Sequence, residues 1–457
     1  MKKILLVTGN TRNNFKRRMN LETLQQLTED KNNEVYILDC NRKMKNSCWI
    51  LTNCHRWGYC KKCLGSFLDY AKKIGFDKKN ILKMQKIKNP QIPDFLSIKD
   101  AINYEIEGYN VGIGPVSSLM TKYRDYQFNI KNNQKNIKKF ITACYTTLKN
   151  IEYYHKQIGF DEIYIFNGRF SVNYGAATFA IKNGIDYTVY DRGANLNKIW
   201  YAKNNLIHDF YYVKKEIAKH WNSTNGEKES IAKEWFKNRR KGKFQAYSSF
   251  TKDQIKELLP KNFDTNKENI GIFNSSIDEV FAYESWQHPF VEHDNILIKN
   301  ILEHYKNDES KHFYLRVHPN LTKAKQLNSS QIREINEFKT KYKNLTVIEP
   351  DDKIDTYALI EAVDKVVTSY STVSCEATYW SSIAILAGKA LYEDLDCAYQ
   401  AKTMEEVYQL IDNKNLKPKP KENSYPYGYY QAVFGKEMKY YRLEEPTVEN
   451  INKMKFI

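Results

Sequence analysis

The chain has 457 residues, of which 42% are hydrophobic, so it is long enough for two domains that each bury a core. No apolar run approaches the roughly 20 residues of a membrane-spanning helix, and we expect no signal peptide, because the first apolar run is short and ends at Gly9. The net charge of +17, from 71 Lys and Arg against 54 Asp and Glu, fits anionic ligands and a lysine-rich proteome equally well.

The N-terminal half alternates predicted strands and helices. Strands are expected at 3–8, 34–38, 162–166 and 186–190, and helices at 20–28 and about 174–183, with a cysteine-rich insertion at 40–63. This alternation predicts parallel βαβ units.

A polar, highly charged stretch at about 222–243 predicts an inter-domain helix and linker, and a second alternation follows it. Strands are expected at 269–274, 312–317, 345–349, 365–368 and 384–387, and helices at 294–305, 332–341, 356–363, 374–380 and 404–411. We therefore expect two Rossmann-like domains with ligands at the carboxyl ends of strands. The expected divisions are an acceptor and catalytic domain at 1–225, a linker at 226–265, a nucleotide-binding domain at 266–420, and a tail at 421–457 that packs back on the first domain.

A histidine-proline motif ends the strand expected at 312–317. It reads Arg316, Val317, His318, Pro319 and Asn320, and the proline turns the chain there. An imidazole at this position can donate a hydrogen bond to a phosphate oxygen, and Arg316 adds positive charge. The alternative is a histidine that only completes a turn.

A hydroxyl cluster follows the strand expected at 365–368. Ser369, Ser371 and Thr372 precede a helix, where their hydroxyls either cap free N–H groups or help to bind an anion. Glu376 lies one turn further on and either binds a ribose hydroxyl pair or interacts with the helix dipole. Two such strand ends in one Rossmann-like domain point to one ligand.

Two further motifs are weaker. Ser275 and Ser276 follow the strand expected at 269–274 and form either a third wall of the same pocket or a turn cap. Gly112 and Gly114 precede a helix and could admit a phosphate or sugar, but their spacing matches no full dinucleotide or P-loop motif.

A carboxylate ends the strand expected at 186–190. Asp191 can act as a general base on an acceptor hydroxyl or as a nucleophile, and Arg192 would lower its pKa on contact. Asn167 and Arg169 follow the neighbouring strand and could line the same cleft. The alternative for Asp191 is a structural turn.

Eight cysteines occur in the chain, and five of them lie between positions 40 and 63. Cys48, Cys54, Cys60 and Cys63 could hold a structural zinc ion or an iron–sulfur cluster, although their spacing matches no common zinc module. The alternative is a set of free, buried thiols.

In their order and spacing, these motifs resemble those of bacterial glycosyltransferases that build capsule and lipopolysaccharide. The His-Pro and Ser-Ser/Thr elements are similar to those of bacterial sialyltransferases and Kdo transferases, which use CMP-activated acidic sugars. This resemblance implies an α/β, GT-B-like fold of two Rossmann-like domains that face a cleft. It covers about residues 160–400 and runs through Asn167-Gly168-Arg169, Asp191-Arg192-Gly193, Asn274-Ser275-Ser276, His318-Pro319 and Ser369-Tyr370-Ser371-Thr372.

The resemblance implies that His318, Ser371 and Thr372 bind the phosphate of a CMP-sugar and that Asp191 is the catalytic carboxylate. One position departs from it, because sialyltransferases have an acidic-acidic-glycine triplet where Arg192 follows Asp191 here. Base and nucleophile therefore both stay open. No Asp-x-Asp motif lies at a matching strand end, so we expect no metal cofactor in catalysis.

The expected activity is transfer of Kdo or another nonulosonic acid from a CMP-sugar to a glycan or glycolipid acceptor of a growing capsule or lipopolysaccharide. The alternatives are a UDP- or GDP-sugar glycosyltransferase of surface polysaccharide synthesis and a non-catalytic component of that machinery. No nucleic-acid module is recognisable, so no nucleic-acid partner is expected. We expect a cytoplasmic protein, with basic patches and the tail tyrosines Tyr425, Tyr427, Tyr429 and Tyr430 as the contact with the inner membrane face.

Overall fold

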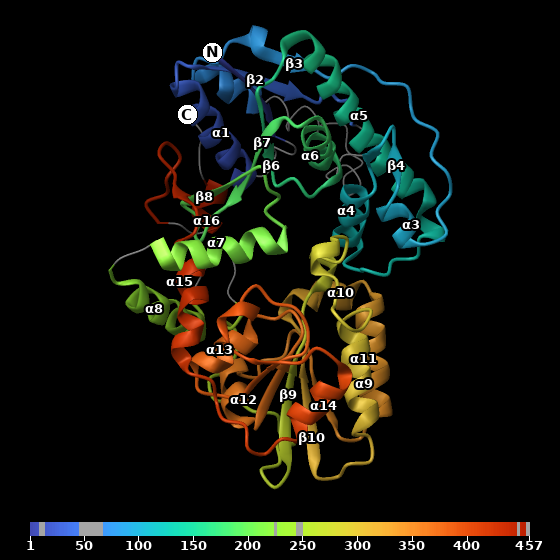
Figure 1. Ribbon diagram of the computed structural model, residues 1–457, viewed down its shortest axis with the longest axis vertical. Coiled ribbons are helices and arrows are strands. Elements are labelled where there is room, and N and C mark those ends of the chain that lie inside the picture. The colour runs from blue at the N-terminus through green and yellow to red at the C-terminus, as the bar shows by residue number, and fades with distance from the viewer. Residues whose placement is uncertain (9–13, 45–66, 224–225, 244–249, 446–447, 454–457) are drawn as a thin grey trace. The chain divides into compact units, whose positions relative to one another are not determined.

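The computed structural model describes residues 1–8, 14–44, 67–223, 226–243, 250–445 and 448–453. The chain forms two compact units (Figure 1). Unit 1 comprises Met1–Lys122, Asn129–Asp209 and Phe434–Ile457, and unit 2 comprises Tyr123–Phe128 and Phe210–Val433. Within the described ranges, no helix is both long and apolar enough to cross a membrane.

Unit 1 contains a seven-stranded sheet in the order β15-β8-β7-β6-β1-β2-β3. The five neighbouring strands from β7 to β3 are parallel. The chain adds β2 and β3 on one side of β1 and later adds β6 and β7 on its other side, so the strand order reverses between β1 and β6. β8 and β15 extend the sheet in antiparallel pairing, which was not predicted. The strands are β1 (Lys2–Val7), β2 (Asn33–Asp39), β3 (Ile81–Lys83), β6 (Glu162–Phe166), β7 (Asp186–Arg192), β8 (Lys198–Lys203) and β15 (Lys436–Glu437).

The helix at 134–158 has apolar residues that recur on one side, and glycines end this helix and the helix at 171–183. Gly159 and Gly184 have φ values of 72° and 63°, the left-handed conformation that stops a helix without a Cβ clash. β1 is buried from Ile4 to Val7, as expected for a parallel strand covered on both faces. The helices are α1 (Asn14–Glu29), α3 (Ile98–Ile102), α4 (Ile113–Tyr123), α5 (Gln134–Ile158), α6 (Ser171–Asn183) and α16 (Val448–Lys453), and a short hairpin pairs β4 (Glu105–Ile106) with β5 (Tyr109–Asn110).

The C-terminal segment of unit 1 is held by a carboxylate of α1. Glu22 accepts hydrogen bonds from three consecutive backbone N–H groups, those of Lys439, Tyr440 and Tyr441, at 2.6, 2.9 and 2.9 Å. Arg18, one turn earlier, is fully buried and contacts the sulfur of Met438. Charge-assisted contacts of this kind explain why these last residues belong to unit 1 rather than to unit 2.

Unit 2 contains a six-stranded parallel sheet in the order β11-β10-β9-β12-β13-β14. Counted within the unit, this is the Rossmann order 3-2-1-4-5-6, so the order reverses between β9 and β12, where such sheets bind ligands. The expected α/β class, GT-B-like in having two Rossmann-like units, is confirmed. The strands are β9 (Glu268–Phe273), β10 (Lys311–Arg316), β11 (Leu345–Ile348), β12 (Lys365–Thr368), β13 (Ala384–Leu386) and β14 (Tyr399–Gln400).

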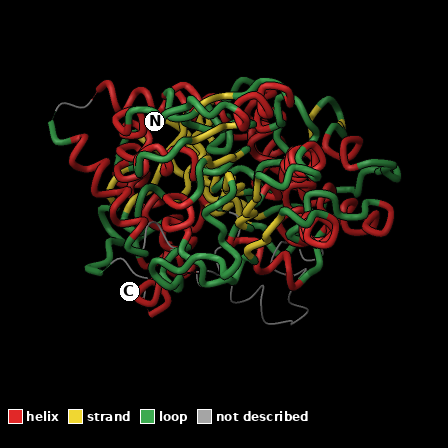
Figure 2. Tube along the Cα trace, turned by 90° about the horizontal axis from the view of Figure 1, so that it is seen from below, coloured by secondary structure: helices red, strands yellow, loops and turns green. Residues whose placement is uncertain are grey.

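Helices pack against the strands of unit 2, and Figure 2 distinguishes helices and strands by colour. One core joins β9, β10, β12 and β13 to α9, α11 and α14, and α9 lies beside α11 (Figure 1). The helices of this unit are α7 (Phe210–Ser223), α8 (Lys228–Arg240), α9 (Asp294–His304), α10 (Thr322–Gln326), α11 (Ser330–Lys341), α12 (Thr356–Ala362), α13 (Val373–Tyr379), α14 (Met404–Asp412) and α15 (Tyr425–Val433).

The stretch expected to be a linker contains α8, which packs against α15 within unit 2. α15 carries the tail tyrosines Tyr425, Tyr427, Tyr429 and Tyr430, which are 2–6% exposed. The expectation that these tyrosines dock on a membrane is therefore wrong, because their rings pack inside unit 2 with partners such as Trp235.

A short segment, 123–128, belongs to unit 2 although the chain on both sides of it belongs to unit 1. Asp125 accepts a hydrogen bond from the Ser330 N–H at 3.1 Å and so caps the start of α11. Arg124 forms an ion pair with Asp278 at 3.2 Å. No pattern in the sequence predicted this segment.

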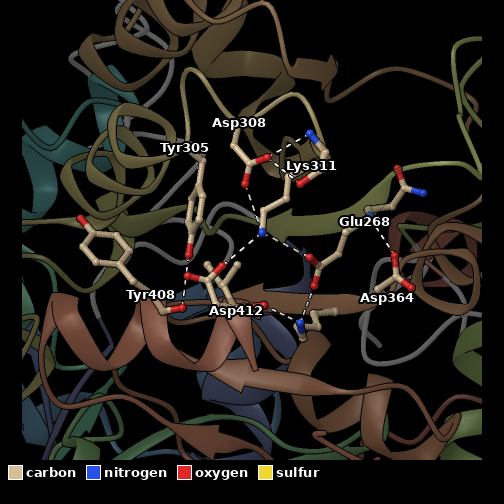
Figure 3. Close-up of polar contacts among 11 residues, drawn as sticks. Glu268, Tyr305, Asp308, Lys311, Asp364, Tyr408 and Asp412 are labelled. Atoms are coloured by element: carbon tan, nitrogen blue, oxygen red, sulfur yellow. Dashed lines mark hydrogen bonds and ion pairs between the residues drawn. The ribbon is translucent and has the colours of Figure 1, made fainter. Parts of the chain in front are cut away.

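A charged cluster joins the amino ends of the strands in unit 2 (Figure 3). The ammonium of Lys311 lies 3.3, 3.1 and 3.2 Å from the carboxylates of Glu268, Asp308 and Asp412. The ammonium of Lys365 lies 2.6 Å from the other oxygen of Glu268. The cluster therefore ties β9, β10, β12 and the end of α14 together at the edge opposite to the carboxyl ends.

Candidate functional site

A pocket in unit 2 lies at the carboxyl ends of β9, β10 and β12. The register aligns Phe273 with both Arg316 and Thr368, so the three strands end at one edge. The loops that follow them supply five lining residues, and the strand ends, the helices and the segment before β9 supply the others. The lining residues are Arg239, Phe250, Thr251, Phe273, Asn274, Arg316, His318, Pro319, Thr356, Tyr357, Ser371, Thr372, Val373 and Glu376.

His318 presents one N–H group to this pocket. Its Nδ1 accepts a hydrogen bond from the backbone N–H of Asn320 at 3.1 Å, so Nδ1 carries no proton. Burial lowers the pKa of His318 to about 4, and the neutral ring therefore keeps its proton on Nε2 at pH 7. A neutral imidazole with this tautomer can donate to an anion without changing its own charge.

Asn274 supplies a second donor. Its Oδ1 accepts the backbone N–H of His318 at 2.8 Å, which fixes the orientation of the side-chain amide. The residue is 2% exposed, and its Nδ2 group has no hydrogen-bond partner among the described residues. A buried amide N–H without a partner costs free energy, so this group is expected to serve a ligand.

Two arginines supply further donors. Arg316 is 3% exposed and donates to the carbonyl oxygens of Glu349 and Asp352 at 2.9 and 3.2 Å. Burial lowers its pKa to about 10, so it stays charged at pH 7. The buried Nε groups of Arg316 and Arg239 have no partner in the described part of the chain.

Glu376 is engaged by the protein itself. One of its oxygens lies 2.9 Å from Arg239 and 2.7 Å from the Thr372 hydroxyl, and the other accepts from Tyr357 at 2.5 Å. Although burial alone would lower it, the Glu376 carboxylate raises the pKa of Arg239 above its usual value. These contacts show that Glu376 holds Arg239 in place, and binding of a ribose by Glu376 stays a prediction.

The lining favours an anion. Arg239 and Glu376 neutralise each other, His318 is neutral, and Arg316 adds one positive charge bonded only to carbonyl groups. The side chains that line the pocket therefore carry a net charge of about +1. Side-chain N–H groups around a single cation are typical of a phosphate site.

The other predicted residues of unit 2 lie beside this pocket rather than in its lining. The Ser275 N–H donates to Asp294 at 3.0 Å, and the Ser276 hydroxyl donates to Asp278 at 2.6 Å. The Asn320 N–H serves His318, and Ser369 is 1% exposed under the loop. These contacts shape the loops that carry the lining residues.

In unit 1, the predicted residues form a separate group at the ends of β6 and β7. The Asn167 side chain donates to the Asp191 carboxylate at 2.6 Å, and Asn167 itself has a φ of 61°. The Arg169 guanidinium lies 4.5 Å from the ring centre of Phe170, and Arg192 ends β7 beside Asp191. The structure thus joins Asn167 to Asp191 and places Arg169 next along the loop.

Close packing explains why glycine occupies positions 112 and 114 of unit 1, where a ligand contact was predicted. A Cβ on Gly112 would lie 1.9 Å from the Ala101 carbonyl oxygen, and one on Gly114 would lie 2.3 Å from the Cβ of Tyr174. Protein atoms fill the space that a phosphate or sugar would need. The expectation that these glycines admit a ligand is therefore wrong at both positions.

The predicted metal ligands Cys48, Cys54, Cys60 and Cys63 lie outside the described residues. Within the described ranges, no group of three or more His, Cys, Asp or Glu side chains is arranged to hold a metal ion.

Sequence reasoning missed several lining residues. Arg239 belongs to α8, far from the strand ends in the chain, and no local pattern identifies it. Tyr357 is the second residue of α12, which follows an Asp355 cap, and such a cap marks a helix but not a site. Asn274 could have been found, because an amide directly after a strand in the order reversal is a candidate ligand-binding group.

The chain is similar to several solved sugar-processing enzymes at low identity. A β-Kdo 2,4-transferase, KpsC of Thermosulfurimonas dismutans, is 12% identical over 59% of this chain and 79% of that chain, with a TM-score of 0.39. The β-Kdo 2,7-transferase of the same protein is 12% identical over 61% and 79%, with a TM-score of 0.36. MnaA of S. aureus in complex with UDP is 12% identical over 94% of both chains, with a TM-score of 0.29.

No protein-family model and no curated protein matches the chain.

Proposed function

We propose that the protein is a glycosyltransferase of surface polysaccharide synthesis and that unit 2 binds the phosphate of its nucleotide-sugar donor. One observation carries this proposal. Four residues with N–H donors, His318, Asn274, Arg239 and Arg316, line one pocket. Three of these donors, Asn274 Nδ2, Arg239 Nε and Arg316 Nε, are buried without a partner among the described residues. A bound anion would accept hydrogen bonds from these donors and so offset the cost of burying them.

The same donors would stabilise the leaving group. Negative charge grows on the phosphate oxygens as the bond to the sugar breaks, and preorganised N–H groups in a site of low polarity oppose that charge strongly. His318 is neutral at pH 7, so it would act by hydrogen bonding rather than by transferring a proton. The proposed step needs no proton on the phosphate.

A CMP-sugar is the donor that we propose. Its single phosphate carries one negative charge, which balances the net charge of about +1 on the lining side chains, whereas the diphosphate of a UDP- or GDP-sugar carries two negative charges. The transferred sugar would be Kdo or another nonulosonic acid, and the acceptor a capsule or lipopolysaccharide glycan, as the sequence motifs predict. A UDP- or GDP-sugar stays the alternative.

We expect His318→Ala to lower donor turnover about 100-fold, because it removes one donor to the charged leaving group. His318→Gln should recover part of the loss, since its amide can donate from a similar position. Released CMP, measured with a CMP-sugar, gives the rate.

His304→Ala is the matched control for this test, because His304 is an exposed histidine of unit 2 that stacks on Tyr408. Near-normal turnover by folded His318→Ala would contradict the assignment of His318.

Asp191 is the carboxylate that we propose for the acceptor step or for a covalent intermediate. Asp191→Asn should lower turnover at least 100-fold while CMP binding stays unchanged, because Asp191 belongs to unit 1 and the phosphate pocket to unit 2. A sugar adduct on the Asp191 peptide, detected by mass spectrometry, would identify a nucleophile. Asp186→Asn, at the other end of β7, is the control, and equal turnover in both variants would refute the role.

A further inference from the structure

A buried carboxyl lies at the order reversal in the sheet of unit 2. Asp294 is the first residue of α9 and is 2% exposed. Its Oδ2 accepts the Ser275 N–H at 3.0 Å. The Ser369 hydroxyl lies close enough to favour the ionised form, although it makes no geometrically complete hydrogen bond. Ser275 follows β9 and Ser369 follows β12, so Asp294 contacts both loops that flank the reversal.

Asp294 is connected to the phosphate pocket through one peptide unit. Asn274 directly precedes Ser275, lines the pocket with its side chain, and accepts the His318 N–H at 2.8 Å. The Ser275 carbonyl is held in turn by the Gln331 side chain at 2.9 Å. The carboxyl of Asp294 therefore fixes the turn that orients two of the pocket donors.

We infer that Asp294 is a positioning residue that makes binding of the nucleotide phosphate dependent on pH near neutrality, an inference that rests on the proposed function. No motif in the sequence pointed to this residue. Asp294 is not itself among the residues that line the pocket.

The surroundings of Asp294 explain its titration. Burial raises the pKa of Asp294 to about 7, while the Ser275 N–H and the Ser369 hydroxyl act in the opposite direction. Two tyrosines interact electrostatically with Asp294, Tyr370 after β12 and Tyr126 of segment 123–128, and burial raises the pKa of both, so both are neutral near pH 7. His293 directly precedes Asp294, and burial lowers its pKa. The carboxylates of Asp125 and of Glu334 in α11 interact with Tyr126.

The direction in which phosphate affinity changes with pH follows from the linkage between phosphate binding and protonation of Asp294. A phosphate anion in the pocket disfavours the ionised form of Asp294 and so raises its pKa further. Binding is then strongest below pH 7, where Asp294 is already protonated. It weakens as pH rises, because the ionised carboxylate must either take up a proton or repel the bound phosphate. His318 is neutral throughout this range and adds nothing to the dependence.

The test measures the affinity of the methyl phosphodiester of CMP, whose single charge is constant, by calorimetry at pH 6, 7 and 8. For the wild type we expect affinity to fall about tenfold from pH 6 to pH 8. Asp294→Asn keeps the shape and an acceptor for Ser275 without the charge, so its affinity should change less than twofold. Asp253→Asn, an exposed carboxylate of unit 2, should keep the wild-type profile.

A second variant guards against a folding defect in Asp294→Asn. Ser369→Ala removes a group that lowers the pKa of Asp294, so the inflection should move to higher pH. Wild-type binding with no pH dependence, or the same profile in Asp294→Asn, would overturn the inference alone. Absence of any binding by the wild type would overturn the proposed function and the inference with it.

Discussion

Arg239→Ala should weaken binding of CMP to the protein by roughly 1,000-fold. The change removes the Nε donor from the pocket and leaves the Glu376 carboxylate, which is 2% exposed, without its cation. A hydrogen bond to a charged group contributes about 1.5–3 kcal/mol, and repulsion between the unpaired Glu376 carboxylate and the phosphate adds to this loss. Calorimetry with CMP measures the change.

Arg240→Ala is the matched control for Arg239→Ala, because Arg240 is the next residue of α8 and pairs with Glu361 at the surface. It should leave CMP affinity within about twofold. Arg239→Lys keeps the charge but lacks an Nε–H, so it should show an intermediate loss. If Arg239→Lys binds as tightly as the wild type, the Nε group is not a phosphate donor.

Lys311→Met should lower the free energy of unfolding of unit 2 by about 3 kcal/mol. The Lys311 side chain is 10% exposed and faces three carboxylates (Figure 3), which would be left without their shared cation. Breaking a buried ion pair costs about 3–5 kcal/mol, and the low end applies because the side chain of Asp412 is 51% exposed. Urea unfolding measures the effect.

Lys306→Met provides the control for this substitution. Lys306 pairs with Glu303 at 2.7 Å, but both side chains are at least 40% exposed, so the loss should stay below about 0.5 kcal/mol. An equal change in both variants would show that the cluster at the amino ends of the strands contributes no more than a surface pair.

The sequence predicted well those pocket residues that lie at strand ends, because the carboxyl ends of parallel strands meet at one edge of the sheet. Arg316, His318, Pro319, Ser371 and Thr372 all line it, as expected from motifs that directly follow β10 and β12. Glu376 also lines it, but a partner from a distant helix determines what its carboxylate does. Such a role depends on tertiary contact and leaves no local pattern.

Other features had no sequence signal or a misleading one. Gly112 and Gly114 look like a ligand-binding pair, yet close approach of Ala101 and Tyr174 explains both. The tyrosines of α15 look exposed in a polar, proline-containing tail, yet they fill the space between helices of unit 2. The periodicity of a sequence indicates which face of a helix or strand is apolar, but not which neighbouring element covers that face.

The measurement that tests the central claim most directly is calorimetry of the wild type with CMP, UDP and GDP, repeated with Asn274→Asp. A carboxylate at position 274 replaces a buried donor by a negative charge that faces the proposed phosphate, whereas Asn328→Asp makes the same change at an exposed turn. We predict that the wild type and Asn328→Asp bind CMP more tightly than UDP or GDP, and that Asn274→Asp binds none of them. Failure of the wild type to bind any of the three, or undiminished binding by Asn274→Asp, would contradict a nucleotide-phosphate site in unit 2.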